Sequence, residues 1–113
     1  MISGIYDPTT QPPNQFSSAY YGEEPAVRAA ARCTEGLLNT GVPLLFSVSE
    51  LDPADFQDQA VQLTAAWHRH KHCYPPMEYL AGHNHLSPAQ AIGSSADDLG
   101  PRLAQFVAVV TSR

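Results

Sequence analysis

The chain has 113 residues, enough for one small domain, whereas an α/β domain with a complete parallel sheet usually needs more. Its composition is 43% hydrophobic and 15% charged with a formal net charge of -5, so it lacks the basic stripe that nucleic-acid binding requires. No apolar run suits a membrane span and no signal-peptide pattern opens the chain, so we expect a cytoplasmic protein that binds neither nucleic acid nor membrane. Cys33 and Cys73 lie far apart and are expected to be thiols rather than a disulfide.

The first half of the chain predicts a strand, a helix and a second strand. Residues 1–7 are expected to form a short buried strand that leads into a loop, because the polar stretch through Ser18 shows no periodicity. A helix should begin near Pro25, a residue favoured in the first helical turn, and end at residues 39–41. Residues 42–48 form a short apolar run, which is typical of a parallel strand covered on both faces.

The second half predicts helix, strand and helix. Apolar residues recur at helical spacing from position 56 to position 67, which favours a long helix. The residues on this face are Phe56, Ala60, Leu63 and Trp67. Residues 77–81 alternate like a third strand, Ser87-Pro88 starts a short helical turn, and a final helix carries Leu103, Phe106, Val107 and Val110. The order β-α-β-α-β-α predicts an α/β fold in which residues 1–113 form a single domain with three parallel strands.

Asp52 and His85 lie where parallel α/β sheets carry their reactive side chains, just past the carboxyl ends of two predicted strands. A carboxylate that holds a histidine in one tautomer and stabilises its imidazolium form is the acid-base pair of a serine hydrolase triad. Asp52 alone would also suit a helix cap. Glu50 is a competing acid, which its place on the strand should direct away from Asp52 or into a supporting role. We predict that a carboxylate oxygen of Asp52 lies about 2.6–3.2 Å from an imidazole nitrogen of His85.

The other histidines are less suited to the role of base. His83 is expected to brace the loop or line the pocket, whereas His85 precedes a helix start and is preferred. His68, His70 and His72 follow H-x-H-x-H spacing, which invites comparison with metal sites. Only His68 and His72 share a helix face, however, and histidines also suit the negative end of a helix dipole. We therefore favour a solvated helix end over a metal site.

The chain contains no recognisable nucleophile for this pair. The G-x-S-x-G motif does not occur, because Ser94 and Ser95 lack the final glycine and follow a predicted helix rather than a strand. Cys73 stands between a helix end and Pro75-Pro76, away from the sheet edge, which argues against a Cys-His pair. The sequence therefore offers an acid and a base without their serine.

Four segments together resemble, in order, the carboxyl-terminal part of carboxylesterase-like α/β hydrolases, in particular small esterases, feruloyl-esterase-like proteins and kynurenine formamidases. They are Ile2–Asp7, the Tyr20-Tyr21-Gly22 turn, Leu44–Pro53 and Gly82–Ser87. The resemblance spans nearly the whole chain. It implies a partial α/β-hydrolase domain that contributes the last three strands of a larger sheet, with Asp52 as the acid and His85 as the base.

In that family the serine and the oxyanion hole lie earlier in the sequence. The resemblance therefore implies a carboxylesterase that forms an acyl-enzyme on a small ester without a metal or organic cofactor, and whose activity needs the N-terminal half of the domain. Until that half or a second copy covers the first strand, its exposed edge predicts self-association or poor solubility. Two alternatives stay open: a formamidase or amidase of the same fold, and a non-catalytic interaction or metal-binding fragment that uses the histidine cluster.

Overall fold

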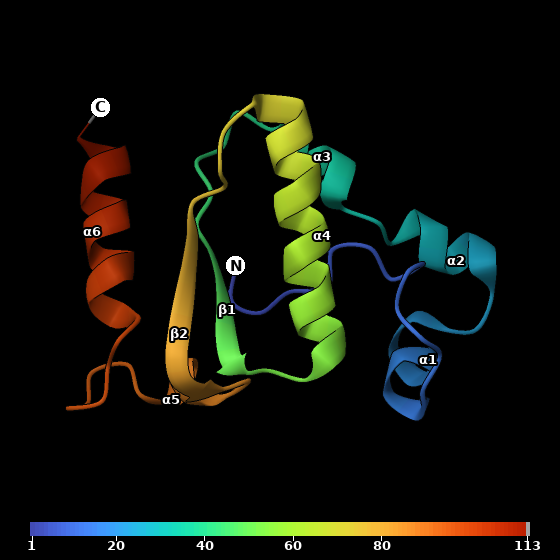
Figure 1. Ribbon diagram of the computed structural model, residues 1–113, viewed down its shortest axis with the longest axis horizontal. Helices are drawn as coiled ribbons and strands as arrows, with labels where there is room; N and C mark the ends of the chain where they lie inside the picture. The colour runs from blue at the N-terminus through green and yellow to red at the C-terminus, as the bar shows by residue number, and fades with distance from the viewer. Residues whose placement is uncertain (113) are drawn as a thin grey trace.

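The computed structural model describes residues 1–112 and has a mixed α/β architecture built on two parallel strands. Strand β1 (Phe46–Leu51) pairs with β2 (Met77–Asn84), and the long helix α4 (Ala54–Lys71) connects them along one side of the sheet (Figure 1). Because the strands are parallel, their carboxyl ends lie at the same edge. The second and third predicted strands and the helix between them are thus present.

The bounds of both strands differ from the prediction: β1 begins and ends later than residues 42–48, and β2 ends later than residue 81. β1 begins only at Phe46, whose N–H donates to the carbonyl of Pro76 at 2.8 Å, and Val42 at the start of the predicted strand is 66% exposed. β2 continues past the predicted end at position 81, because a bulge between Ser49 and Leu51 lets the pairing go on. His85 therefore follows β2 directly instead of standing four residues beyond it.

The first segment makes an isolated parallel bridge rather than the strand predicted over residues 1–7. Ile2 lies opposite Ser47, with hydrogen bonds from the Ser3 N–H to the Ser47 carbonyl (3.0 Å) and from the Ser47 N–H to the Met1 carbonyl (2.9 Å). Ser3 then takes a left-handed φ of 42°, which turns the chain out of the extended conformation. Within residues 1–112 the sheet has two strands, and the strand predicted over residues 1–7 is not confirmed, so the three-stranded sheet is not confirmed either.

A short helix, α1 (Gln15–Tyr21), occupies part of the stretch that was predicted to be a loop through Ser18. It starts at a capping box, in which the Asn14 side chain accepts from the Ser17 N–H and the Ser17 hydroxyl accepts from the Asn14 N–H. The two polar residues Asn14 and Ser17, three positions apart, were the sequence signal for the start of this helix. The prediction missed the helix because it relied on apolar periodicity, which this stretch lacks.

The helix predicted from Pro25 to residues 39–41 is wrong as one continuous element. It is divided into α2 (Pro25–Ala30) and α3 (Thr34–Asn39). Between them the N–H of Cys33 and the hydroxyl of Thr34 both donate to the carbonyl of Tyr6, at 2.9 and 3.2 Å. These tertiary hydrogen bonds replace those that a continuous helix would make.

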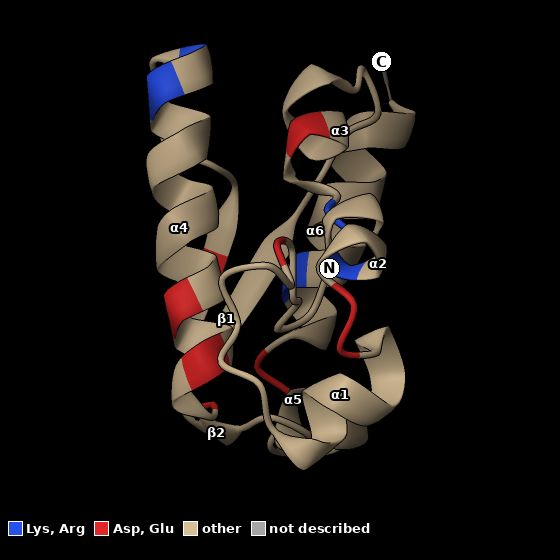
Figure 2. Cartoon of the chain, turned by 90° about the vertical axis from the view of Figure 1, so that its right-hand side faces the viewer, with Lys and Arg blue, Asp and Glu red and all other residues tan. Residues whose placement is uncertain are grey.

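The hydrophobic core lies between α4 and the sheet. The ring of Phe46 meets Tyr6 and Trp67 edge to face, with centroids 5.8 and 5.7 Å apart, and Leu63 is buried beside them. Full burial of each such side chain contributes about 1.5–3 kcal/mol. Helix α4 has acidic residues near its start and basic residues at its end (Figure 2), an order that complements its dipole.

Gln59 joins α4 to the segment that precedes α1. Its Oε1 accepts from the N–H groups of Tyr6 and Asp7 at 2.9 and 2.8 Å, and its Nε2 donates to the Asp7 carbonyl and the Thr10 hydroxyl. The side chain is buried, so these four bonds satisfy groups that water does not reach. They hold the first segment against the helix.

Two helices follow β2: the single turn α5 (Ser87–Gln90) and α6 (Gly100–Thr111). Before α6, the half-buried Asp97 accepts through its carboxylate from the backbone N–H groups of Gly93 (2.8 Å) and Gly100 (2.6 Å), and these bonds lower the pKa of its carboxyl group. Helix α6 lies beside β2 at the opposite end of the molecule from α1 and α2 (Figure 1).

The apolar face of α6 is only partly covered. Of the residues predicted for that face, Leu103, Phe106 and Val110 are half-buried and Val107 is 53% exposed. No helix within residues 1–112 combines the length and the apolar character that crossing a membrane requires.

Candidate functional site

Asp52 and His85 meet at the edge where the two strands end. Oδ1 of Asp52 lies 2.8 Å from Nδ1 of His85, so the predicted distance between the carboxylate and the imidazole is confirmed. Each residue follows its strand directly, and the parallel pairing of β1 with β2 brings them together across the sheet edge. The arrangement gives His85 a fixed acceptor for an Nδ1–H and thereby sets its tautomer.

The Asp52 side chain is fully buried and receives further hydrogen bonds. Its Oδ2 accepts from the hydroxyl of Ser3 and from the backbone N–H of Ser49, each at 2.7 Å. Three donors therefore surround one carboxylate, which compensates for its removal from water. Asp52 does not cap α4, whose N-cap is Pro53, so the cap interpretation of this residue is wrong.

The His85 ring is held on one side and open on another. The centroids of the His85 ring and the Phe56 ring of α4 are 4.1 Å apart, and the two ring planes are inclined by 43°. The side chain is 35% exposed, and Nε2 has no hydrogen-bond partner among the described residues. The free Nε2 can therefore take a proton from a hydroxyl that approaches from outside, while Nδ1 stays bound to Asp52.

Glu50 supports the loop rather than competing for the histidine. Its Oε2 accepts from the backbone N–H of Gly82 at 2.6 Å, which joins the end of β1 to the end of β2. Gly82 adopts a φ of 74°, a conformation that favours glycine. Among the described residues the Glu50 carboxylate makes no hydrogen bond to Asp52 or His85, so it is neither the competing acid nor a direct partner of the pair.

His83 braces the loop, as one of its two predicted roles requires. It is buried, with Nδ1 2.9 Å from the hydroxyl of Ser87 and Nε2 3.0 Å from Oδ2 of Asp98. The Ser87 hydroxyl also accepts from the Asn84 N–H. These bonds fold the segment after β2 into the tight turn that presents His85.

Ser3 and Asp98 are the two site residues that sequence reasoning missed. Ser3 lies at the far end of the chain from Asp98, and neither belongs to a recognisable motif. For Ser3 the available signal was the buried strand predicted over residues 1–7. If that segment pairs with β1 in parallel, its end lies at the same sheet edge as Asp52. The sequence contains no comparable signal for Asp98.

The clustered histidines lie apart from this site. His68 and His70 belong to the last turn of α4, and His72 ends the helix with a left-handed φ of 56°. In residues 1–112 no three metal-ligating side chains come together. Cys73 is exposed and Cys33 is half-buried, and burial is the main cause that raises the pKa of the Cys33 thiol.

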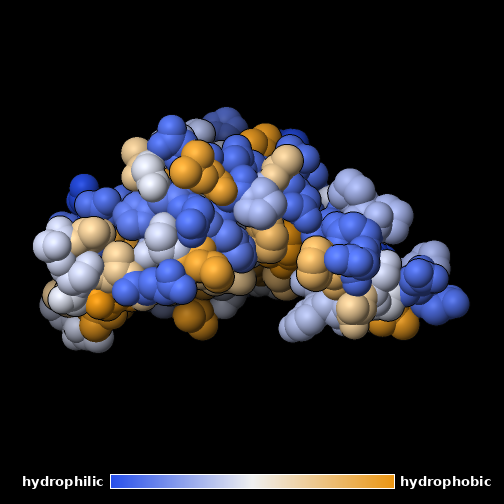
Figure 3. All heavy atoms as spheres, turned by 90° about the horizontal axis from the view of Figure 1, so that it is seen from below, coloured by the Kyte–Doolittle hydropathy of each residue, from blue (hydrophilic) through white to orange (hydrophobic). Residues whose placement is uncertain are grey.

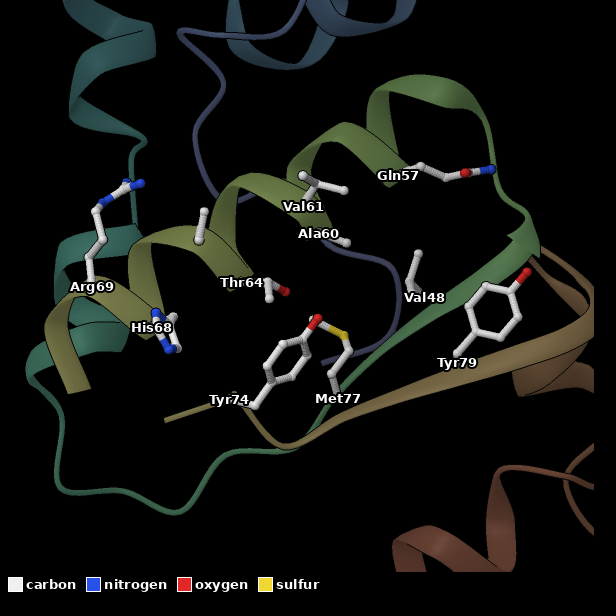
Figure 4. A pocket seen from close by; sticks show the side chains of 11 residues that line it. Val48, Gln57, Ala60, Val61, Thr64, His68, Arg69, Tyr74, Met77 and Tyr79 are labelled. Atoms are coloured by element: carbon white, nitrogen blue, oxygen red, sulfur yellow. The ribbon is translucent and has the colours of Figure 1, made fainter. Parts of the chain in front are cut away.

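Several hollows adjoin α4, and two of them bear on the choice of site. The larger, of about 750 Å³, lies between α4 and the sheet, where Val48, Met77 and Tyr79 face Thr64 and His68 (Figure 4). It includes neither Asp52 nor His85, so its size alone does not make it the reactive site.

The second hollow, of about 640 Å³, contains His85 in its wall. Phe56 at α4 and the aromatic residues of α1 line it, and the surface is indented between the main body and the part formed by α1 and α2 (Figure 3). A substrate in this hollow would lie against the side chain of His85. The region that the sequence predicted to be a loop thus forms a wall of the candidate site.

No protein-family model matches this chain, and no curated protein matches it either.

Proposed function

We propose that this chain supplies the acid and the base of a serine ester hydrolase of the α/β-hydrolase class. The observation that carries the proposal is the 2.8 Å contact between the buried Asp52 carboxylate and Nδ1 of His85, a residue whose Nε2 has no partner among the described residues and whose side chain lines a hollow. A buried structural ion pair would not need an accessible second nitrogen at the carboxyl edge of a parallel sheet.

The chemistry follows from the two ring nitrogens. Nε2 of His85 removes the proton of a serine hydroxyl as its oxygen attacks the ester carbonyl, and Asp52 stabilises the imidazolium that forms. The same proton then passes from Nε2 to the departing alcohol oxygen. In the second half of the reaction His85 activates water, which cleaves the acyl-serine bond and regenerates the hydroxyl.

The serine is proposed to come from a polypeptide segment outside these 113 residues. In the assembled sheet, residues around Ile2 would form a third parallel strand, flanked by β1 on one side and by the segment that carries the serine on the other. This pairing would bring the serine to the same carboxyl edge as Asp52 and His85. It would also cover the N–H and C=O of Ile2 that face away from β1.

The test uses the protein encoded by the complete reading frame that contains this chain. We expect an in-frame G-x-S-x-G upstream, labelling of its serine by a fluorophosphonate probe, and hydrolysis of p-nitrophenyl acetate. His85→Ala should reduce the hydrolysis rate by at least about 10³-fold, whereas His70→Ala, which changes an exposed histidine of α4, should leave it unchanged. A frame without that motif, or equal rates for the two variants, would overturn the proposal.

The same assay separates the ester from the amide alternative. An N-formyl arylamine is offered in parallel with the ester, and the ratio of the two kcat/KM values assigns the substrate class.

A further inference from the structure

The hollow beside His85 is lined by aromatic rings from two separate elements. Helix α1 contributes Phe16, Tyr20 and Tyr21, and α4 contributes Phe56. Phe16 is 77% exposed and Tyr20 is 82% exposed, which is unusual for side chains of their size. Exposed aromatic residues around a hollow are typical of a binding site.

Among the polar groups of this hollow, Asp55 carries a carboxylate that can only accept hydrogen bonds. Asp55, in the first turn of α4, lines it, and its Oδ2 accepts from Nε2 of Gln11 at 2.7 Å. That bond fixes the Gln11 amide, whose Oε1 is buried and has no hydrogen-bond partner within residues 1–112. Asp55 is half-buried, and its carboxylate is the charged acceptor in the wall of the hollow.

The charge of the hollow is negative. Asp55 is the only acidic residue among the described residues that line it, and neither a lysine nor an arginine does so. Burial and then the neighbouring Tyr20 raise the pKa of Tyr21, so its phenol is neutral. Four aromatic side chains complete this wall, and the face of an aromatic ring attracts a cation.

The guanidinium of Arg28 lies near the hollow without lining it, and its positive charge opposes the negative charge of Asp55. Arg28 of α2 is buried and donates to the carbonyls of Gly22 and Pro8 and to the hydroxyl of Ser17, at 2.9, 3.1 and 3.1 Å. Its guanidinium is thus committed to the chain and does not line the hollow. An experiment must nevertheless include an anion, because Arg28 would favour one.

We infer that the hollow binds an organic ammonium group carried by the ester substrate, and this assignment rests on the proposed hydrolase function. The rings of Phe16, Tyr20 and Phe56 contact the cation, and the Asp55 carboxylate balances its charge and accepts one of its N–H groups. The ester carbonyl of such a molecule would then lie toward His85.

The first test measures binding to the 113-residue chain itself, which needs no serine. Benzylammonium, benzyl alcohol and benzoate share one ring and differ in charge, and each is titrated while the NMR signals of His85 and Phe56 are followed. Benzylammonium should bind at least about tenfold more tightly than benzyl alcohol, and benzoate should bind least. Equal binding of the three, or tightest binding of benzoate, overturns the assignment.

Two variants locate the site. Asp55→Asn should reduce the affinity for benzylammonium to that for benzyl alcohol, whereas Asp58→Asn, an equal change of charge at an exposed position of the same helix, should not alter it. Phe16→Leu changes a mostly exposed side chain and should weaken binding at least about threefold without affecting folding. Equal losses in the Asp55 and Asp58 variants would mean that net charge, rather than the hollow, attracts the cation.

The outcomes separate the two proposals. If benzylammonium binds as expected but His85→Ala leaves ester hydrolysis by the full-length protein unchanged, the cation site stands and the hydrolase function falls. If hydrolysis depends on His85 but an ester of an amino alcohol is cleaved no faster than its neutral analogue, the hydrolase function stands and the ammonium assignment falls.

Discussion

Replacement of Asp52 by asparagine should change both the tautomer of His85 and the stability of the fold. An amide can place its oxygen where Oδ2 now accepts from Ser3 and Ser49, which leaves its NH₂ group facing Nδ1 of His85. Two donors cannot share a hydrogen bond, so the histidine must move its proton from Nδ1 to Nε2. In that form Nε2 no longer accepts a proton from a hydroxyl, and the ester hydrolysis that we propose for the full-length protein should slow by about 10⁴-fold.

The stability change can be estimated from the same bonds. The two bonds to Oδ2 become neutral rather than charge-assisted, which weakens each by about 1 kcal/mol, while removal of a buried charge offsets part of this loss. We expect a net decrease of about 1–3 kcal/mol in the free energy of unfolding, or a Tm lower by about 4–12 °C for a chain of this size. Asp58→Asn, at an exposed position, should lie within about 0.5 kcal/mol of the unmodified chain.

The tautomer is read from the imidazole ¹⁵N shifts at pH 8, where histidine is ordinarily neutral. Denaturant unfolding of the chain and both variants gives the free energies. If Asp52→Asn keeps the proton on Nδ1 of His85 and unfolds like Asp58→Asn, the contact between Asp52 and His85 does not orient the ring, and the reasoning is refuted.

Three further predictions concern the rest of the fold. Gln59→Leu leaves the buried N–H of Tyr6 without an acceptor and should lower the free energy of unfolding by about 2–4 kcal/mol; an unchanged urea midpoint would contradict this. Asp97 has a pKa lowered by backbone hydrogen bonds, so it stabilises the folded state above its ordinary pKa of 3.8 and loses that effect as the pH falls through the folded value. The stability difference between the chain and Asp97→Asn should therefore shrink from pH 6 to pH 2, and a constant difference would show that these bonds do not favour the carboxylate. Finally, the isolated chain should self-associate through the edge at Ile2, and Ile2→Lys should shift it toward monomer in sedimentation velocity; an unmodified chain that is monomeric at high concentration would rule this out.

The sequence was sufficient to predict the elements that local pattern determines. The apolar run before Asp52, the regular spacing along α4 and the break at Pro75-Pro76 predicted two parallel strands joined by a helix, and hence the meeting of Asp52 with His85. Strand order and chain direction follow from such patterns because a parallel pair requires a crossover.

Tertiary hydrogen bonds explain most of what local pattern did not predict. The carbonyl of Tyr6 interrupts the expected helix at Cys33, and a bulge at the end of β1 extends β2 to Asn84. Neither feature leaves a periodic trace in the sequence. The hydrogen bond from Ser3 to Asp52 is likewise invisible to a local pattern, because it joins residues 49 positions apart.

That bond links the acid of the site to the outermost segment of the sheet. Ser3 stands in a left-handed conformation one residue after the bridge at Ile2, so its hydroxyl is oriented only while the bridge to β1 is formed. Loss of that pairing would withdraw one of the three donors that hold Asp52. The orientation of His85 is thus coupled, through a single serine, to whatever docks on the open edge of the first segment, and assembly of the sheet and alignment of the site become one event.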